Sequence, residues 1–293
     1  MMITNLFFAS RVVIFAIAIT VLLPLRASGA ADLLPDLYNS AAIVTGQELP
    51  NRIAAASVAL PRVLVKVSGD PSVAADPKVK LYADRAINML AGFTYRDQMA
   101  GIPVRDEQGT RDRPYDLTLQ FDPVKIGEIL QKLGRRPWSG ARPKVVVVFS
   151  LDQGAWYTVS SDDMRSLGPR EALYNASERA GLDVALPTAD QISTKLNGMK
   201  PFEVPAETRE YLAVALVPVT SGSHVVLTGE AVWDDDILGW RTDWQIAANG
   251  KIIRWRIERV SYDEAFRNGL IGAAQILSGH GVPPRFASGA TLK

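Results

Sequence analysis

Residues 144–149 read Lys-Val-Val-Val-Val-Phe, an apolar, mostly β-branched run that no charge interrupts after its first residue. A run of this kind is typical of a strand buried on both faces of a mainly parallel sheet. Gly168-Pro169 then begins a predicted helix that Gly181 ends, and a short strand is expected over residues 182–186. These elements predict an α/β arrangement around the 144–149 strand.

Three further strands are expected on the C-terminal side, over residues 225–233, 238–247 and 252–260. Asn249-Gly250 joins the last two, and this dipeptide favours a tight antiparallel hairpin. Ser261 with Glu264 forms a capping box, from which a helix is expected to run to Leu277. The second half is therefore predicted as an α/β domain over 144–280 whose mixed sheet ends in antiparallel hairpins and a C-terminal helix. Residues 281–293 are expected to be a disordered tail.

The first half predicts a second mixed α/β domain, over residues 31–136. Strands are expected over residues 38–45 and over 115–121, where apolar and polar residues alternate. Residues 53–67 carry a helical stripe that Pro61 interrupts, which predicts a kink or a change to a strand over 63–67. Asp76-Pro77 is expected to begin a helix through Leu90 that ends at Gly92.

Residues 137–143 are expected to link these two domains, because the surrounding segment GRRPWSGARP at 134–143 is rich in glycine, proline and charge. The predicted fold class is therefore α/β (α+β), with two mixed domains.

The N-terminus resembles a signal peptide. Arg11 precedes an apolar run over residues 12–23, and Ser28 and Ala30 occupy the small-residue positions of a cleavage site after Ala30. The run is short for a membrane span, which needs about 20 apolar residues. An uncleaved N-terminal anchor remains the alternative. Residues 31–293 contain no second run of spanning length, so residues 1–30 predict export to the periplasm.

Composition limits the function classes. The chain has no cysteine, which excludes disulfides, thiolate metal sites and cysteine nucleophiles. Arg11 and Arg26 are the only charges in residues 1–30, so residues 31–293 carry 30 basic and 31 acidic residues. A balance near zero gives no electrostatic case for a nucleic-acid partner.

Sequence motifs for catalysis are absent. The chain has two histidines, His224 and His280, and no HExxH, GxSxG, SxxK, P-loop or dinucleotide fingerprint. Residues 160–163 (Ser-Ser-Asp-Asp) are interpreted as a polar loop rather than a nucleophile site. Residues 234–236 (Asp-Asp-Asp) are interpreted as a hairpin tip rather than a calcium loop, because the position for a bidentate glutamate is Gln245. No catalytic residue, metal site or cofactor is predicted, although paired carboxylates that meet only in the fold stay open.

Tryptophans on the C-terminal strands are the candidate binding residues. Trp240 and Trp244 share one face of a strand, and in the next strand Trp255 alternates with Arg254 and Arg256. Such strands can present a surface for a carbohydrate or a protein partner. We favour the alternative, in which the rings pack beneath the last helix.

Several of these segments resemble one family of exported bacterial proteins, the domain-of-unknown-function 2066 family. The similar segments are LPRVLVKVSGD at 60–70, residues 117–123 with the helix ending at Leu133-Gly134, Trp138, residues 213–217 and residues 227–229. The resemblance implies no known activity and supplies no catalytic residue. The second half also resembles α/β modules of envelope assembly factors, such as the amino-terminal domain of the Tol-system β-propeller protein, which is a fold-level analogy only.

The sequence thus favours a non-catalytic periplasmic protein that acts by binding, as an envelope-assembly accessory with another envelope protein as its partner. The alternative is an exported carboxylate-based hydrolase of cell-wall or polysaccharide material. A deep pocket with two facing carboxylates of shifted pKa would favour the enzyme. An exposed apolar patch or an open sheet edge without such a pocket would favour a partner site.

Overall fold

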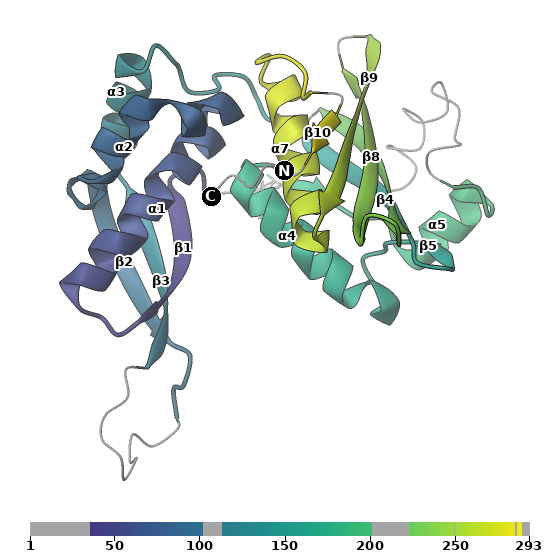
Figure 1. The fold of residues 1–293 in the computed structure, drawn as a ribbon, viewed down its shortest axis with the longest axis horizontal. Coiled ribbons are helices and arrows are strands. Elements are labelled where there is room, and N and C mark those ends of the chain that lie inside the picture. Colours follow the sequence, from purple (N-terminus) through teal and green to yellow (C-terminus); the bar gives the residue numbers. More distant parts are fainter. Residues whose placement is uncertain (1–35, 102–112, 201–222, 249, 285, 289–293) are drawn as a thin grey trace, which may run out of the picture. The chain divides into compact units, whose positions relative to one another are not determined.

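The computed structural model describes residues 36–101, 113–200, 223–248, 250–284 and 286–288. They contain two separate sheets, each with its own hydrophobic core, which confirms the predicted α+β class (Figure 1). The predicted signal peptide with Ala30 and the segment 213–217 lie outside these residues. Among the helices that the structure describes, none has the length and apolar character needed to cross a membrane.

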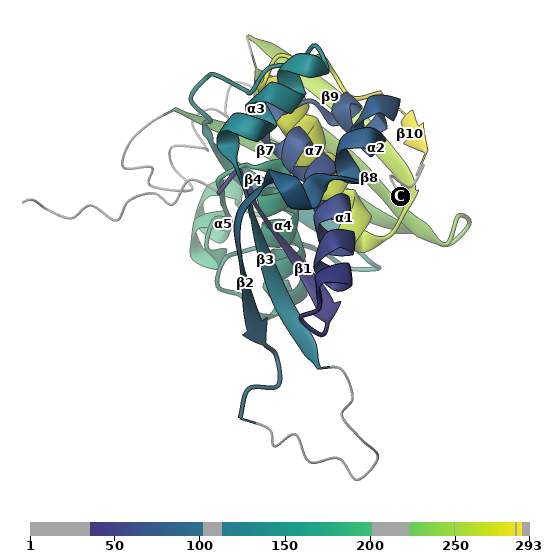
Figure 2. The ribbon, with the colours of Figure 1, turned by 90° about the vertical axis from the view of Figure 1, so that its left-hand side faces the viewer.

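The N-terminal sheet is antiparallel, and its strands lie in the order β1-β3-β2. The elements of this half are β1 (Asn39–Thr45), α1 (Leu49–Ser68), the 3-10 turn η1 (Pro71–Ala75), α2 (Pro77–Ala83), the 3-10 turn η2 (Ala86–Met89), β2 (Leu90–Asp97), β3 (Pro114–Phe121) and α3 (Pro123–Lys132). Leu117, Leu119 and Phe121 of β3 are fully buried against the helices, and α1 lies along the sheet, against β1 and β3 (Figure 2). The opposite face of this sheet carries polar side chains such as Asp116 and Thr118.

α1 continues through Pro61 as one helix, so the strand expected over residues 63–67 is wrong. Pro61 has no N–H to donate to the carbonyl of Ser57, which costs the helix one hydrogen bond. The apolar stripe on both sides of Pro61 is buried in the N-terminal core, and Leu60 and Val63 have no exposed surface. Tertiary packing of this stripe therefore holds the helix together across the proline.

The helix expected from Asp76 to Leu90 is too long. Asp76 does cap it, because its side chain accepts a hydrogen bond from the backbone N–H of Lys78, but α2 ends at Ala83. The strand β2 begins at Leu90, contains Gly92 and pairs with β3. The 3-10 turn η2 lies between α2 and β2, and long-range pairing with β3 overrides the helical spacing from Leu90 onward.

The C-terminal sheet has the strand order β10-β9-β8-β7-β4-β5, and β6 also pairs with β4. β4 is parallel to β6 and β7, whereas β7, β8 and β9 form antiparallel hairpins. The elements are β4 (Lys144–Asp152), β5 (Trp156–Thr158), the 3-10 turn η3 (Met164–Ser166), α4 (Leu167–Ala180), β6 (Val184–Ala185), α5 (Ala189–Leu196), β7 (His224–Asp234), β8 (Gly239–Ala248), β9 (Lys251–Val260), α7 (Tyr262–Leu277) and β10 (Phe286–Ser288). β10 lies within the segment expected to be a disordered tail and pairs parallel with β9, so that expectation is wrong for Phe286–Ser288.

Helices cover both faces of the C-terminal sheet, as the β4 sequence predicts. Val145, Val147 and Phe149 belong to a core with α4 and α7, and Val146 and Val148 pack with Leu196 of α5 on the other face (Figure 1). Every residue of β4 between its two ends is buried. The predicted mixed sheet with antiparallel hairpins and a C-terminal helix is confirmed.

Trp244 is the centre of the larger core. Its ring packs on Phe149 with centroids 4.8 Å apart and on Phe266 with centroids 6.4 Å apart. Gly269 of α7 lies against the indole so closely that an added Cβ would overlap the ring. The helix can reach the sheet here only because this residue has no side chain.

We predict that Gly269→Ala lowers the free energy of unfolding by about 1–3 kcal/mol, because the methyl group forces Trp244 or the helix to move. Gly127→Ala is the matched control, since Gly127 also lies in a helix but has open space where its Cβ would be. That control should leave stability unchanged or raise it, by about 1 kcal/mol at most. Urea unfolding followed by circular dichroism measures both. Equal stability of the two variants would contradict this account of the core.

Candidate functional site

The predicted tryptophans are buried. Trp240, Trp244 and Trp255 expose 8%, 0% and 3% of their surface and belong to the core beneath α7. Their rings therefore offer almost no surface to a partner in this structure. They pack beneath the last helix, which is the alternative that we favoured from the sequence. The sequence pattern correctly places Trp240 and Trp244 on one face of a strand, but which face α7 covers depends on the fold.

Arg254 and Arg256 lie on β9, on the face opposite to Trp255. Each is hydrogen-bonded to a side chain of the neighbouring strand β8. Arg256 binds Asp243 through two hydrogen bonds, Nε to Oδ1 at 2.7 Å and Nη2 to Oδ2 at 2.9 Å. These bonds to Asp243 raise the pKa of Arg256. Arg254 donates from Nε to Oε1 of Gln245 at 3.1 Å. These contacts are the cross-strand pairs that stabilise a sheet.

The two acidic segments noted in the sequence have structural roles. In the tip between β7 and β8, Asp234 Oδ1 accepts from the backbone N–H of Asp236 at 3.0 Å. In the loop after β5, Ser160 Oγ accepts from the backbone N–H of Asp163 at 3.0 Å. Within the described ranges no three histidine, aspartate or glutamate side chains are grouped so as to hold a metal ion.

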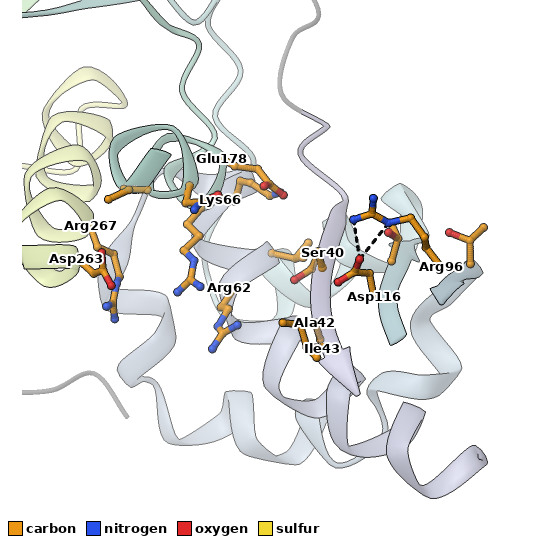
Figure 3. Close-up of a pocket in the computed structure, with 18 of the residues that line it drawn as sticks. Ser40, Ala42, Ile43, Arg62, Lys66, Arg96, Asp116, Glu178, Asp263 and Arg267 are labelled. Atoms are coloured by element: carbon orange, nitrogen blue, oxygen red, sulfur yellow. Dashed lines mark hydrogen bonds and ion pairs between the residues drawn. The ribbon is translucent and has the colours of Figure 1, made fainter. Parts of the chain in front are cut away.

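A cleft of about 950 Å³ offers a different candidate site. It is lined by Ser40, Ala41, Ala42 and Ile43 of β1, by residues of α1, α4 and the start of α7, and by polar residues of β2 and β3. Figure 3 shows Arg62 and Lys66 on one side of β1 and Asp116, joined to Arg96, on the other. The cleft therefore surrounds the free edge of β1.

Three arginines meet in this cleft: Arg62 from α1, Arg179 from α4 and Arg267 from α7. Burial lowers the pKa of Arg62, and the positive charges of Arg179 and Arg267 lower it further. None of the three has an ion pair or hydrogen bond with any residue that the structure describes. The cleft thus holds a cationic cluster, defined here as these three arginines, to which no described carboxylate is bound, and Glu178 and Asp263 also line the cleft.

Lys66, one helical turn after Arg62, is a fourth cation but is already engaged. Its side chain is 4% exposed, and Nζ donates to the backbone carbonyls of Asp36 at 3.0 Å and Asn39 at 2.6 Å. Burial lowers the pKa of Lys66, Glu178 and Asp36 oppose that shift, and Arg142 adds to it. Lys66 therefore fixes the start of β1 against α1 and leaves the arginines to contact a ligand.

Asp116 is the carboxylate on the sheet side of the cleft, and it is held in its ionised form. It accepts from Gln98 Nε2 at 2.6 Å and from Arg96 Nη2 at 2.6 Å. The hydrogen bond from Gln98, followed by the hydrogen bond and charge of Arg96, lowers the pKa of Asp116. This ion pair leaves the sheet side of the cleft neutral, whereas on the side of the three helices Arg62, Lys66, Arg179 and Arg267 outnumber Glu178 and Asp263.

One family description matches part of the chain, "Domain of unknown function (DUF8605)", over residues 31–139. The matched segment contains Arg62, Lys66 and Asp116 but neither Arg179 nor Arg267. This match supports the expectation of a domain of unknown function. It does not support the 2066 family, which is a different family description. No curated protein and no solved structure matches the chain.

Sequence reasoning missed this cleft because its arginines lie at positions 62, 179 and 267, in three different helices. The one local signal is the spacing of Arg62 and Lys66, four residues apart on α1 and therefore on the same side of that helix. That signal alone does not distinguish a site from a solvated helix face.

We predict that Arg62→Met raises the free energy of unfolding at low ionic strength by about 0.5 kcal/mol, a value discounted for solvent screening. The reason is the removal of repulsion among like charges. The gain should shrink as salt rises from about 0.01 M to about 1 M, where the Debye length falls from about 30 Å to about 3 Å. Arg85→Met, at an exposed arginine without a described side-chain partner, should show no such salt dependence. Thermal unfolding at several salt concentrations measures this, and a salt-independent loss of stability in Arg62→Met would contradict it.

Proposed function

We propose that this chain is an exported, non-catalytic binding protein of the bacterial envelope whose cleft binds an acidic segment of another envelope protein. The cationic cluster is the observation that carries this proposal. Three like charges brought together without partners cost stability. Carboxylates of a bound partner would remove that cost, because bonds between guanidinium and carboxylate groups are among the stronger ones that proteins form.

Asp116, the acidic residue of the cleft whose pKa is shifted, supports binding rather than hydrolysis. A carboxylate-based hydrolase needs a general acid whose pKa is raised so that it stays protonated. The pKa of Asp116 is instead lowered, and both of its oxygens accept hydrogen bonds. A carboxylate in this state is an anchored charge and not a proton donor, so the hydrolase alternative gains no support from it.

Export rests on the sequence of residues 1–30. The charged start, the apolar run and the small residues before Ala31 match what the export machinery and signal peptidase require. The resemblance to the 2066 family of exported proteins also favours the periplasm. That location stays a prediction.

We predict that the full chain, expressed in a bacterium, is recovered from the periplasm with Ala31 as its first residue. Amino-terminal sequencing of the osmotic-shock fraction measures this. Ala30→Leu should leave the protein unprocessed, because the cleavage site requires a small side chain there. Asp32→Asn, past the cleavage point, should be processed normally. A chain with Met1 to Ala30 intact in the soluble cytosol would contradict export.

We predict that the purified protein binds poly-L-glutamate through the cationic cluster. Replacement of Arg62, Arg179 and Arg267 by glutamine should weaken binding at least about tenfold, which corresponds to about 1.4 kcal/mol. The matched control replaces Arg85, Arg136 and Lys78 by glutamine, which removes the same charge from exposed side chains that do not line the cleft. Fluorescence anisotropy of labelled poly-L-glutamate measures both.

Equal loss of binding in the two triple variants would mean that net charge alone attracts the polymer, and would contradict a site in the cleft. Circular dichroism of each variant checks that the fold is retained.

A further inference from the structure

The strand β1 has one edge to which no strand of the described residues is bound. In the described part of the N-terminal sheet, β1 pairs with β3 alone, through all of its residues from Asn39 to Thr45. Edge strands of natural proteins are usually covered, shortened or protected by charge, because free backbone groups invite pairing with another chain. In this fold the cleft surrounds the free edge of β1.

The hydrogen-bonding pattern identifies which residues of β1 face that edge. Tyr38 just before the strand accepts from Phe121 N, and Gly46 just after it donates to Arg113 O, so even-numbered residues bond toward β3. In an antiparallel pair, successive residues point their backbone groups to opposite sides. The odd-numbered residues of β1 therefore direct their N–H and C=O groups into the cleft.

Side chains of α1 occupy the two ends of this free edge and leave its middle open. Lys66 Nζ donates to the carbonyl of Asn39, and Asn51 Nδ2 donates to the carbonyl of Thr45. The N–H and C=O groups of Ala41 and Ile43 lie between these ends, and no residue of the described chain bonds to them. The open stretch is therefore about three residues long.

Arg62 lies beside this open stretch. α1 runs back along β1, because Asn51 contacts Thr45 near the start of the helix and Lys66 contacts Asn39 near its end. Arg62 precedes Lys66 by one turn, about 6 Å. Ala41 follows Asn39 by two strand residues, about 7 Å. Arg62 of α1 is thus level with the free backbone groups, and it lines the cleft on the α1 side of the strand (Figure 3).

We propose that the occupant of the cleft is an extended segment of a partner protein that adds to the edge of β1 as a fourth, antiparallel strand and carries an acidic residue opposite Ala42. This rests on the proposed function and specifies its ligand. Residues opposite Ala41 and Ile43 would exchange backbone hydrogen bonds with β1, as in strand addition to other sheet edges.

The side chains of the added strand follow from the alternation in β1. Ala42 points toward α1 and packs on the N-terminal core, so a residue opposite it points toward Arg62. Ile43 points to the other face and is 72% exposed, so a β-branched apolar residue opposite it would cover its side chain. The fitting pattern is apolar-acidic-apolar, with Arg179 and Arg267 available to further acidic residues.

The test uses the peptide Ac-Thr-Val-Glu-Val-Thr-NH₂ and the protein purified after expression of the full chain. NMR titration should shift the amide signals of Ala41 and Ile43, and it gives the affinity. N-methylation of both valines removes the N–H groups that would donate to β1, and should weaken binding at least about tenfold. N-methylation of the glutamate is the matched control, because its N–H points away from β1 and binding should be retained.

Two substitutions test the same contacts from the protein side. Ile43→Pro deletes one N–H at the free edge without breaking a bond to β3, and should weaken binding of the unmodified peptide. Ile43→Ala keeps that N–H and should bind more tightly than Ile43→Pro. Exchange of glutamate for glutamine in the peptide should weaken binding to the unaltered protein, and this loss should disappear in Arg62→Gln.

The outcomes separate this inference from the proposed function. Equal binding of the peptide with N-methylated valines, together with loss of binding in Arg62→Gln, would overturn strand addition and leave an acidic ligand in the cleft. No binding of this peptide, although poly-L-glutamate binds through the three arginines, would likewise overturn strand addition alone. Pairing of two β1 edges in a dimer of this chain, seen by sedimentation as peptide-reversible self-association, would replace the partner protein with a second copy and overturn the inference.

Discussion

The partly buried guanidinium of Arg142 connects the ends of the two helices, α1 and α4, on which the cleft depends. Its Nη1 donates to the carbonyl of Gly181 at 2.8 Å, directly after α4, and its Nη2 donates to the carbonyl of Lys66 at 2.9 Å, near the end of α1. The guanidinium also lies 4.2 Å from the ring centroid of Trp138. Burial lowers the pKa of Arg142 to about 10, so the side chain stays charged at neutral pH and complements the partial negative charge at both helix ends. Because this contact fixes α1 beside α4, it also brings the arginines of these two helices to one cleft.

The three arginines of the cationic cluster repel one another, and packing in the rest of the fold outweighs this repulsion. α4 and α7 pack side by side over a core that contains Phe149, Trp244 and Phe266, and this packing sets where their exposed arginines point. Each buried aromatic ring contributes far more than the repulsion between solvated charges costs. Departures from local consistency of this kind are expected at functional sites. The contrast with Asp116, Asp243 and their arginine partners is informative, because elsewhere the chain does pair its charges across neighbouring strands.

The C-terminal sheet could be predicted from sequence because its signals are local. The unbroken run at 144–149 indicates burial on both faces, and the capping residue Ser261 begins the last helix at the expected position. The segment from Asp76 to Leu90 could not be predicted, because its apolar spacing suits one helix, whereas the chain turns after Ala83, forms η2 and enters β2 at Leu90. The cleft could not be predicted either, since it depends on which helix ends meet and on which edge of β1 stays free. Periodicity identifies the face of a residue within its own element, and only the tertiary arrangement shows what that face meets.

The proposed site has two parts, the three arginines and the free backbone groups of Ala41 and Ile43. Together they favour a peptide over simpler ligands. A small anion would neutralise the arginines but leave the N–H and C=O groups of Ala41 and Ile43 facing solvent. An uncharged strand would pair with those groups but leave Arg62 facing a chain that offers no counter-charge. An extended acidic segment satisfies both, because backbone pairing places every second side chain on the α1 side, where Arg62 lies. Hydrogen bonds along the edge then supply affinity that does not depend on sequence, whereas the position of the arginine selects the acidic residue.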